Sequence, residues 1–201
     1  MKRTLSTVLA IVLAFSMSIY GSATSAPETF IVAFDDGWAE VSETQYYEIQ
    51  SIEDRDAFIK ENGIELTPNE PTPRLYVAGE IMNTSSQARA LGTWRINSHN
   101  ISSKTKMSYY KPDGSPFNFS TSTDKSFYAI YRISGTLFMT ANFTLGFEGA
   151  SNISTPYSKV GPAVINYSYY PAKSGNYTFY CTNNSDFTLP VNTGSIQIRN
   201  T

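Results

Sequence analysis

The chain has 201 residues with a formal net charge of −2, and 41% of its residues are hydrophobic. It contains one cysteine and one histidine, which excludes a disulfide framework and a metal site built from several cysteine or histidine ligands. The basic residues of the part from residue 75 to residue 201 are scattered singly, without the clustered positive charge typical of nucleic-acid-binding proteins, so nucleic acid is not expected as a partner.

The first 25 residues are typical of a secretory signal peptide. Lys2 and Arg3 precede an apolar run from Leu5 to Tyr20, and small residues follow, with cleavage expected within residues 23–26. No other stretch reaches the roughly 18 apolar residues that a membrane-spanning helix needs. Together with the single cysteine, this pattern predicts a bacterial protein that is secreted and has no transmembrane segment in its mature part.

The charges divide the remaining chain into two parts. Residues 27–74 hold twelve acidic and three basic residues, whereas residues 75–201 hold five acidic and ten basic residues. We therefore expect a small acidic segment of strand and helix over residues 26–66. The proline-rich residues 67–74 are expected to form an extended connector to a second domain over residues 75–201.

Three short elements are predicted within the acidic segment. Residues 29–34 and 46–50 carry apolar and aromatic residues typical of strands. Residues 51–62 are expected to form a helix that begins at a polar cap and ends at Asn62-Gly63. Such a short helix is not stable alone and must pack on another part of the protein.

The first predicted strand ends in Phe34-Asp35-Asp36-Gly37, which resembles the first motif of the polysaccharide deacetylase family. The resemblance implies that Asp36, beside Asp35, would ligate a divalent metal. That family completes its metal site with two histidines spaced H-x-x-x-H, and the only histidine here, His99, has no second imidazole near it. The sequence therefore excludes this family and predicts a turn, because glycine tolerates positive φ and aspartate bonds nearby backbone groups.

Residues 75–201 are expected to form an antiparallel β-sandwich of about eight strands, similar to a jelly roll in layout. Segments rich in β-branched and aromatic residues are separated by turn signals, with no helical period between them. A closed barrel is the alternative. The predicted strands cover residues 75–82, 91–96, 104–110, 126–133, 136–147, 163–170, 177–182 and 195–199.

The second domain is rich in aromatic residues, many of them in adjacent pairs. Neighbouring residues of a strand point to opposite faces, so one ring of each pair is expected outside the core, where it could stack on a sugar or pack on a protein. The alternative is that tyrosine simply suits a half-buried strand surface. The residues predicted to form this contact surface are Trp94, Tyr109, Tyr110, Tyr169, Tyr170 and Tyr180.

No catalytic motif is visible in the sequence. It lacks a G-x-S-x-G elbow, a Walker loop, a Cys-x-x-Cys pair and an H-E-x-x-H helix. Cys181 shares a strand face with Tyr177 and Phe179, which predicts a buried, unreactive thiol. The chain is therefore expected to be neither an enzyme nor dependent on a cofactor.

These observations predict a secreted, non-catalytic binding or structural module of the extracellular or cell-surface space. Its partner is expected to be a glycan, a cell-wall component or a protein. The alternative is a toxin-like or bacteriocin-like effector made as a proprotein, in which the acidic segment masks the cationic domain until cleavage near Arg74. A metal-dependent hydrolase that uses Asp35 and Asp36 is a more remote alternative.

Overall fold

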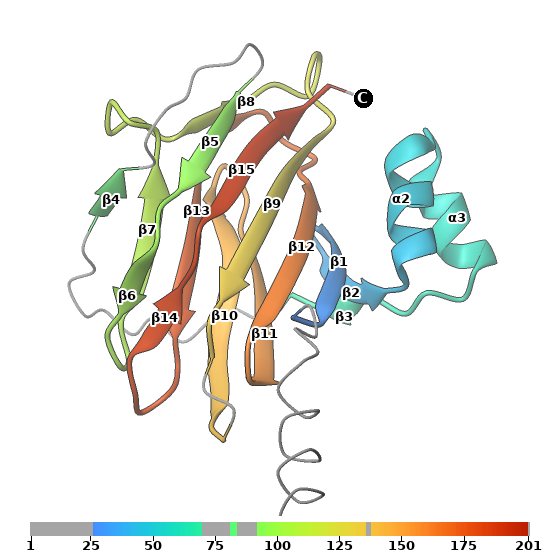
Figure 1. The fold of residues 1–201 in the computed structure, drawn as a ribbon. Coiled ribbons are helices and arrows are strands. Elements are labelled where there is room, and N and C mark those ends of the chain that lie inside the picture. Colours follow the sequence, from blue (N-terminus) through green and yellow to red (C-terminus); the bar gives the residue numbers. More distant parts are fainter. Residues whose placement is uncertain (1–25, 70–80, 84–91, 136–137, 201) are drawn as a thin grey trace, which may run out of the picture.

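The structure is a computed structural model that describes residues 26–69, 81–83, 92–135 and 138–200, and it confirms the predicted β-sandwich (Figure 1). The predicted signal peptide and most of the predicted strand at residues 75–82 lie outside the described residues. Two sheets, here called A and B, contain nine and six strands. Twelve of these strands lie in residues 75–201, where about eight are predicted. Three strands of three residues each carry too little pattern to be recognised, and a longer strand over residues 153–160 is also missed.

Sheet A follows the order β3-β2-β1-β12-β9-β14-β6, and β15 pairs with both β9 and β5. Its strands are β1 (Glu28–Phe34), β2 (Gly37–Val41), β3 (Thr67–Pro68), β5 (Thr93–Ile96), β6 (His99–Ile101), β9 (Ser126–Ile133), β12 (Ala163–Tyr170), β14 (Leu189–Val191) and β15 (Gly194–Arg199). Sheet B follows the order β11-β10-β13-β7-β4, with β8 beside β13. Its strands are β4 (Ile81–Asn83), β7 (Lys106–Tyr110), β8 (Phe117–Phe119), β10 (Thr140–Gly149), β11 (Ile153–Val160) and β13 (Gly175–Asn183).

The acidic segment and the sandwich share a sheet. Strand β1 lies between β2 and β12, and it pairs with β12 in parallel over seven residue pairs, so sheet A is not purely antiparallel. Ile31 and Ala33 of β1 point into the core between the sheets, while Phe30 and Val32 point to the outer side of sheet A. Removal of this strand would therefore expose both layers of apolar packing.

Two helices, α2 (Glu43–Ser51) and α3 (Arg55–Glu61), lie against the outer side of sheet A (Figure 1). The predicted strand at residues 46–50 is wrong, because Ser42 and Gln45 form a capping box that starts α2. Tyr46 and Ile49, three positions apart, then face the sheet together and are fully buried. Within the described residues, no helix is long and apolar enough to span a membrane.

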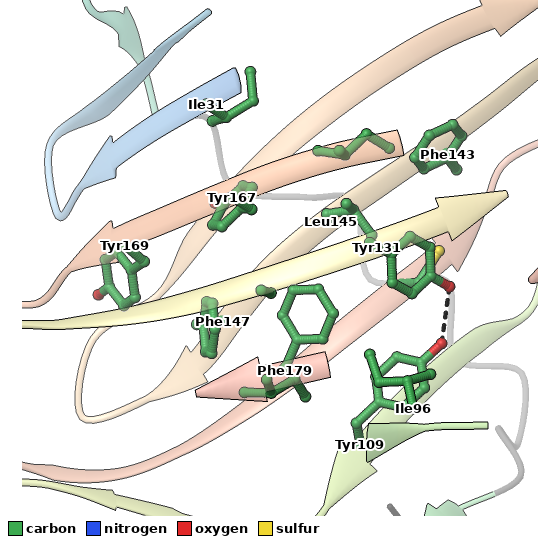
Figure 2. Close-up of a cluster of buried hydrophobic side chains, with 14 of the residues drawn as sticks. Ile31, Ile96, Tyr109, Tyr131, Phe143, Leu145, Phe147, Tyr167, Tyr169 and Phe179 are labelled. Atoms are coloured by element: carbon green, nitrogen blue, oxygen red, sulfur yellow. Dashed lines mark hydrogen bonds between the residues drawn. The ribbon is translucent and has the colours of Figure 1, made fainter. Parts of the chain in front are cut away.

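The core between the sheets is dominated by stacked aromatic rings, as Figure 2 shows around Phe147 and Phe179. Phe127 stacks on Phe147 at a centroid distance of 4.6 Å, and Phe147 stacks on Tyr169 at 5.3 Å. Large rings fill the space between two sheets with few conformational degrees of freedom, and offset or tilted contacts between them add to the burial energy. The sandwich is therefore a rigid base for the groups on its two outer faces.

Candidate binding face

The outer side of sheet A is divided into a covered and an open half. Helices α2 and α3 cover the half formed by β1, β2, β12 and part of β9, where the apolar side chains form a second cluster. Tyr46 fixes α2 to this half through a hydrogen bond between its hydroxyl and that of Ser168, at 2.9 Å. At the border of the two halves, Arg199 stacks on Tyr128 at 3.7 Å and donates a hydrogen bond to Gln50 of α2.

The open half, called the open face below, consists of the outward side chains of β5, β15 and the end of β9. Alternation assigns them, because the intervening residues of each strand, such as Ile96 and Ile196, point into the core. Thr93 and Arg95 are exposed and the others are partly exposed. The residues of the open face are Thr93, Arg95, Ile130, Arg132, Ser195 and Gln197.

The strand register brings Arg95 and Arg132 onto one surface. Arg95 lies opposite Ser195, and Ser195 lies opposite Ile130, two residues before Arg132. Two strand spacings and two residue steps place the Cα atoms of the two arginines roughly 12 Å apart. Arg199 lies four residues beyond Ser195 along β15, so the three arginines form a triangle around the hydroxyl of Ser195 and the amide of Gln197.

The arginines of this surface form no ion pair with another described residue. The three ion pairs found in the described part of the chain all involve lysines, namely Lys104–Asp186, Lys106–Glu148 and Lys159–Glu40. The guanidinium group of Arg132 donates to the carbonyl of Thr193 at 3.1 Å. Through the strand register Glu28 lies level with Arg132 but two strands away, so their Cα atoms are roughly 10 Å apart. The Glu28 carboxylate accepts a hydrogen bond from Asn166 instead.

Four of the six aromatic residues predicted for a contact surface are buried, which corrects that prediction. Tyr109 and Tyr169 point into the core between the sheets, and Tyr170 lies beneath the helices with Arg55 stacked on its ring at 4.4 Å. Tyr180 points to the outer side of sheet B, but its ring is buried over Gly146, and Nζ of Lys106 lies 4.2 Å from the ring centroid. The pair Tyr169–Tyr170 has no exposed ring because the helices cover the outer face and make both sides of β12 interior.

The other two predicted aromatic residues, Trp94 and Tyr110, are partly exposed but do not share a surface. Trp94 belongs to sheet A and packs from the core side on Phe117, with ring centroids 4.9 Å apart. Tyr110 belongs to sheet B and points outward from β7, as its alternation with the buried Tyr109 requires. No stacking platform formed by both rings results.

Asp35 and Asp36, the weak metal candidates, have different environments. The carboxylate of Asp35 accepts hydrogen bonds from the Tyr169 hydroxyl at 2.5 Å and from the Ser151 hydroxyl at 2.9 Å, which ties the β1–β2 turn to the sandwich. Burial, and secondarily the Asp35 carboxylate, raise the pKa of Tyr169 above its usual range. Asp36 is exposed, and its backbone carbonyl accepts a hydrogen bond from Asn69. The described residues contain no group of three or more histidine, cysteine, aspartate or glutamate side chains that could hold a metal.

A chain of hydrogen-bonded side chains crosses the core from Cys181, which contacts Tyr131, through Tyr109 to His99. The Tyr109 hydroxyl lies 2.9 Å from Nε2 of His99 and 2.8 Å from the Tyr131 hydroxyl, the latter contact shown dashed in Figure 2. Nδ1 of His99 donates to the carbonyl of Asn97, so Nε2 of the neutral ring accepts from Tyr109. Burial lowers the pKa of His99 and raises the pKa of the Cys181 thiol to about 12. The predicted burial of Cys181 is confirmed.

Exposed apolar side chains lie at one end of the sandwich, just before β10 and at the end of β11. Phe138 is 95% exposed and Met139 is 44% exposed, just before β10 begins. Val160, at the end of β11, is 60% exposed and lies opposite Thr140. Phe138 and Met139 precede β10 and Val160 ends β11, so these residues lie outside the open face and form a separate surface feature.

The sequence matches no protein-family description and no curated protein. Solved structures with similar arrangements include a GH115 4-O-methyl-α-glucuronidase, BtGH115A, described as specific for decorated arabinogalactans, at 11% identity and a TM-score of 0.37. The match covers 55% of this chain but only 18% of that enzyme, so the chain spans a small part of its length.

Two smaller proteins show similar resemblance. PliG of Aeromonas hydrophila, a periplasmic inhibitor of g-type lysozyme, has 11% identity and a TM-score of 0.36, with 61% of this chain and 100% of that chain covered. The C-terminal CBM6 of the laminarinase LamC from Zobellia galactanivorans has 17% identity and a TM-score of 0.31, with 52% and 98% covered. At these TM-scores none of the three indicates the function of the present chain.

Proposed function

We propose that the protein is a secreted, non-catalytic binding module that contacts its partner through the open face. The observation that carries the proposal is the unequal covering of sheet A. One half of its outer side is closed by helices, and the adjoining half leaves polar and cationic side chains of three strands in solvent. Side chains on paired strands are held more accurately than side chains on loops, which suits recognition without rearrangement.

The environments of the other reactive groups support binding over catalysis. The carboxylate of Asp35 is occupied by two hydroxyl groups and the backbone N–H of Ala172. The thiol of Cys181 is buried and, with its raised pKa of about 12, is protonated at neutral pH. His99 uses both ring nitrogens in hydrogen bonds to Asn97 and Tyr109. None of these groups pairs a nucleophile with a free base.

The single buried cysteine allows a direct test by site-specific blocking. Thr93→Cys introduces an exposed thiol on the open face, and Ser158→Cys introduces one on the outer side of sheet B. Each variant is labelled with a polyethylene glycol maleimide. Cys181 should not react with this reagent, because its thiol is buried and protonated. Binding is measured by co-sedimentation with insoluble cell-wall and extracellular polysaccharide of the native producer.

We expect the wild type and the labelled Ser158→Cys variant to sediment, and the labelled Thr93→Cys variant to stay in solution. Equal sedimentation of both labelled variants would show that the open face is not the contact surface. Failure of the wild type to sediment with any fraction would contradict the binding function itself.

A further inference from the structure

We propose that the ligand of the open face is an acidic polysaccharide, whose sugar units carry carboxylate or sulfate groups. This inference rests on the proposed binding function and adds the chemical class of the ligand. It follows from three properties of the face. Its arginines form no ion pair with another described residue, neutral hydrogen-bonding side chains lie between them, and apolar anchors are scarce.

The positive charge of the open face favours an anionic partner. Arg95 and Arg132 point outward from the same sheet surface, and Arg199 marks its border with the helices. Among the described residues their guanidinium groups form no ion pair, while the lysines at three other places do. Arginine presents a planar fork of donors that matches carboxylate and sulfate-like anions in two-point hydrogen bonds, and it stays charged at all physiological pH values.

The residues between the arginines suit a ligand rich in hydroxyl groups. Ser195, Gln197 and Thr93 lie on adjacent strands, with Ser195 opposite Arg95 and Gln197 opposite Thr93. Each offers both a donor and an acceptor to a sugar hydroxyl. Neutral donors between two arginines roughly 12 Å apart favour a polymer whose charges are separated by uncharged hydroxyl groups.

Other polyanions and a protein partner fit this surface less well. Duplex DNA carries one charge for roughly every 1.7 Å of its axis and is bound by denser clusters of cations. Protein interfaces are centred on buried aromatic or aliphatic anchors, and Ile130, which is partly buried against the helical layer, is the only apolar residue of the open face. The exposed Glu43 and Glu48 belong to α2, which borders the open face. Their negative charges repel a polyanion, so it is confined to the open face with its arginines.

The test measures binding of the full secreted chain to immobilised dextran sulfate, polygalacturonate and unmodified dextran by surface plasmon resonance. Dextran sulfate and dextran share one backbone and differ in charge. The test variant is Arg95→Gln with Arg132→Gln, and the matched control is Lys60→Gln with Lys173→Gln, which removes the same charge from exposed positions outside the face. Thermal unfolding verifies that both double variants fold.

We expect the wild type to bind at least one of the two acidic polymers and to bind dextran more weakly. Loss of two charge-assisted contacts should lower the affinity of the arginine variant roughly tenfold or more, while the lysine variant stays close to the wild type. Equal weakening of the two double variants would overturn the inference, because it would show attraction by net charge alone.

Three further results would also overturn it. Equal binding of dextran and dextran sulfate, unaffected by the arginine substitutions, would reject the acidic ligand and leave the binding function in place. Binding to phosphatidylglycerol vesicles without binding to either acidic polymer would assign the face to a lipid surface. If no polysaccharide binds, the acidic ligand is rejected, and the co-sedimentation of the labelled variants decides the binding function separately.

Discussion

The two halves of the outer side of sheet A differ sharply, although β9 and β12 carry the same alternating pattern. In the covered half most outward residues are apolar or aromatic, such as Phe30, Val32, Tyr128 and Tyr170, and helices α2 and α3 close over them. In the open half the corresponding positions hold arginine, threonine, serine and glutamine, with Ile130 as the one apolar residue. Side-chain chemistry on an outward sheet face therefore reports whether another layer covers it.

The comparison also separates stability from recognition. Outward residues of the covered half contribute apolar burial and therefore free energy of folding. Outward residues of the open half bury little surface and are available to a partner. Substitutions in the covered half should thus change stability, and substitutions in the open half should change binding.

Removal of the acidic segment should have the largest effect. A chain that begins at Leu75 lacks β1 and both helices, so it leaves β12 unpaired on one side and exposes both apolar clusters. We expect no cooperative unfolding transition and no native near-ultraviolet circular dichroism. A well-folded, soluble fragment would contradict the shared sheet and would revive the proprotein hypothesis.

Truncation of Tyr46 should destabilise the covered half. Its ring is fully buried beneath α2 and its hydroxyl bonds Ser168, so Tyr46→Ala should lower the free energy of unfolding by about 3–5 kcal/mol. The neighbouring Tyr47 is 53% exposed, and Tyr47→Ala should cost less than about 1 kcal/mol. Urea unfolding measures both, and similar costs for the two variants would show that the helices do not pack as described.

Asp35 and Asp36 provide a matched pair at the end of β1. Asp35→Ala leaves the buried hydroxyl of Tyr169 without its carboxylate partner and should cost about 1–3 kcal/mol in urea unfolding. Asp36→Ala should leave both stability and bound metal content unchanged, because its side chain is exposed. A loss of bound metal in the Asp36 variant would instead support the metal-dependent hydrolase.

His99 should make stability depend on pH by a smaller amount. Its pKa is lowered in the folded state, so below the unfolded value of about 6.5 the unfolded chain binds more protons. The contribution of the neutral ring is therefore complete above about pH 6.5 and is lost as the pH falls below it. The difference in unfolding free energy between wild type and His99→Gln should shrink between pH 7.5 and pH 5, and a constant difference would contradict the assignment.

Arg95→Gln should have the smallest effect on stability, within about 0.5 kcal/mol in urea unfolding, because the side chain is exposed and lies on the open face. A loss of more than 1 kcal/mol would show that the open half also supports the fold. The substitution should lower only the affinity for the partner.

The sequence predicts the strands in the interior of each sheet well and the strands at the sheet edges poorly. The bounds of β9 and β12 match the prediction, because both are rich in aromatic and β-branched residues. Strand β11 is missed because Pro156 and several polar residues interrupt its pattern, and an edge strand tolerates proline since one of its sides makes no ladder bonds.

The candidate face could not be found in the sequence because it depends on distant pairing. Alternation alone places Arg95, Arg132 and Arg199 on outward positions of three segments. Only the register between β15 and its two neighbours, β5 and β9, brings them side by side. In the same way, the aromatic pairs were expected to reach the surface because no local signal shows that a helical layer covers β12.

The most direct test is to measure which arginines a bound partner protects from phenylglyoxal modification, quantified by mass spectrometry of the intact chain and its peptides. With bound extracellular polysaccharide of the native producer, we expect modification of Arg95 and Arg132 to slow several-fold. Arg55, which stacks on Tyr170 in the covered half, should react at an unchanged rate. Bound material that leaves Arg95 and Arg132 as reactive as in the free protein would show that the partner contacts another surface.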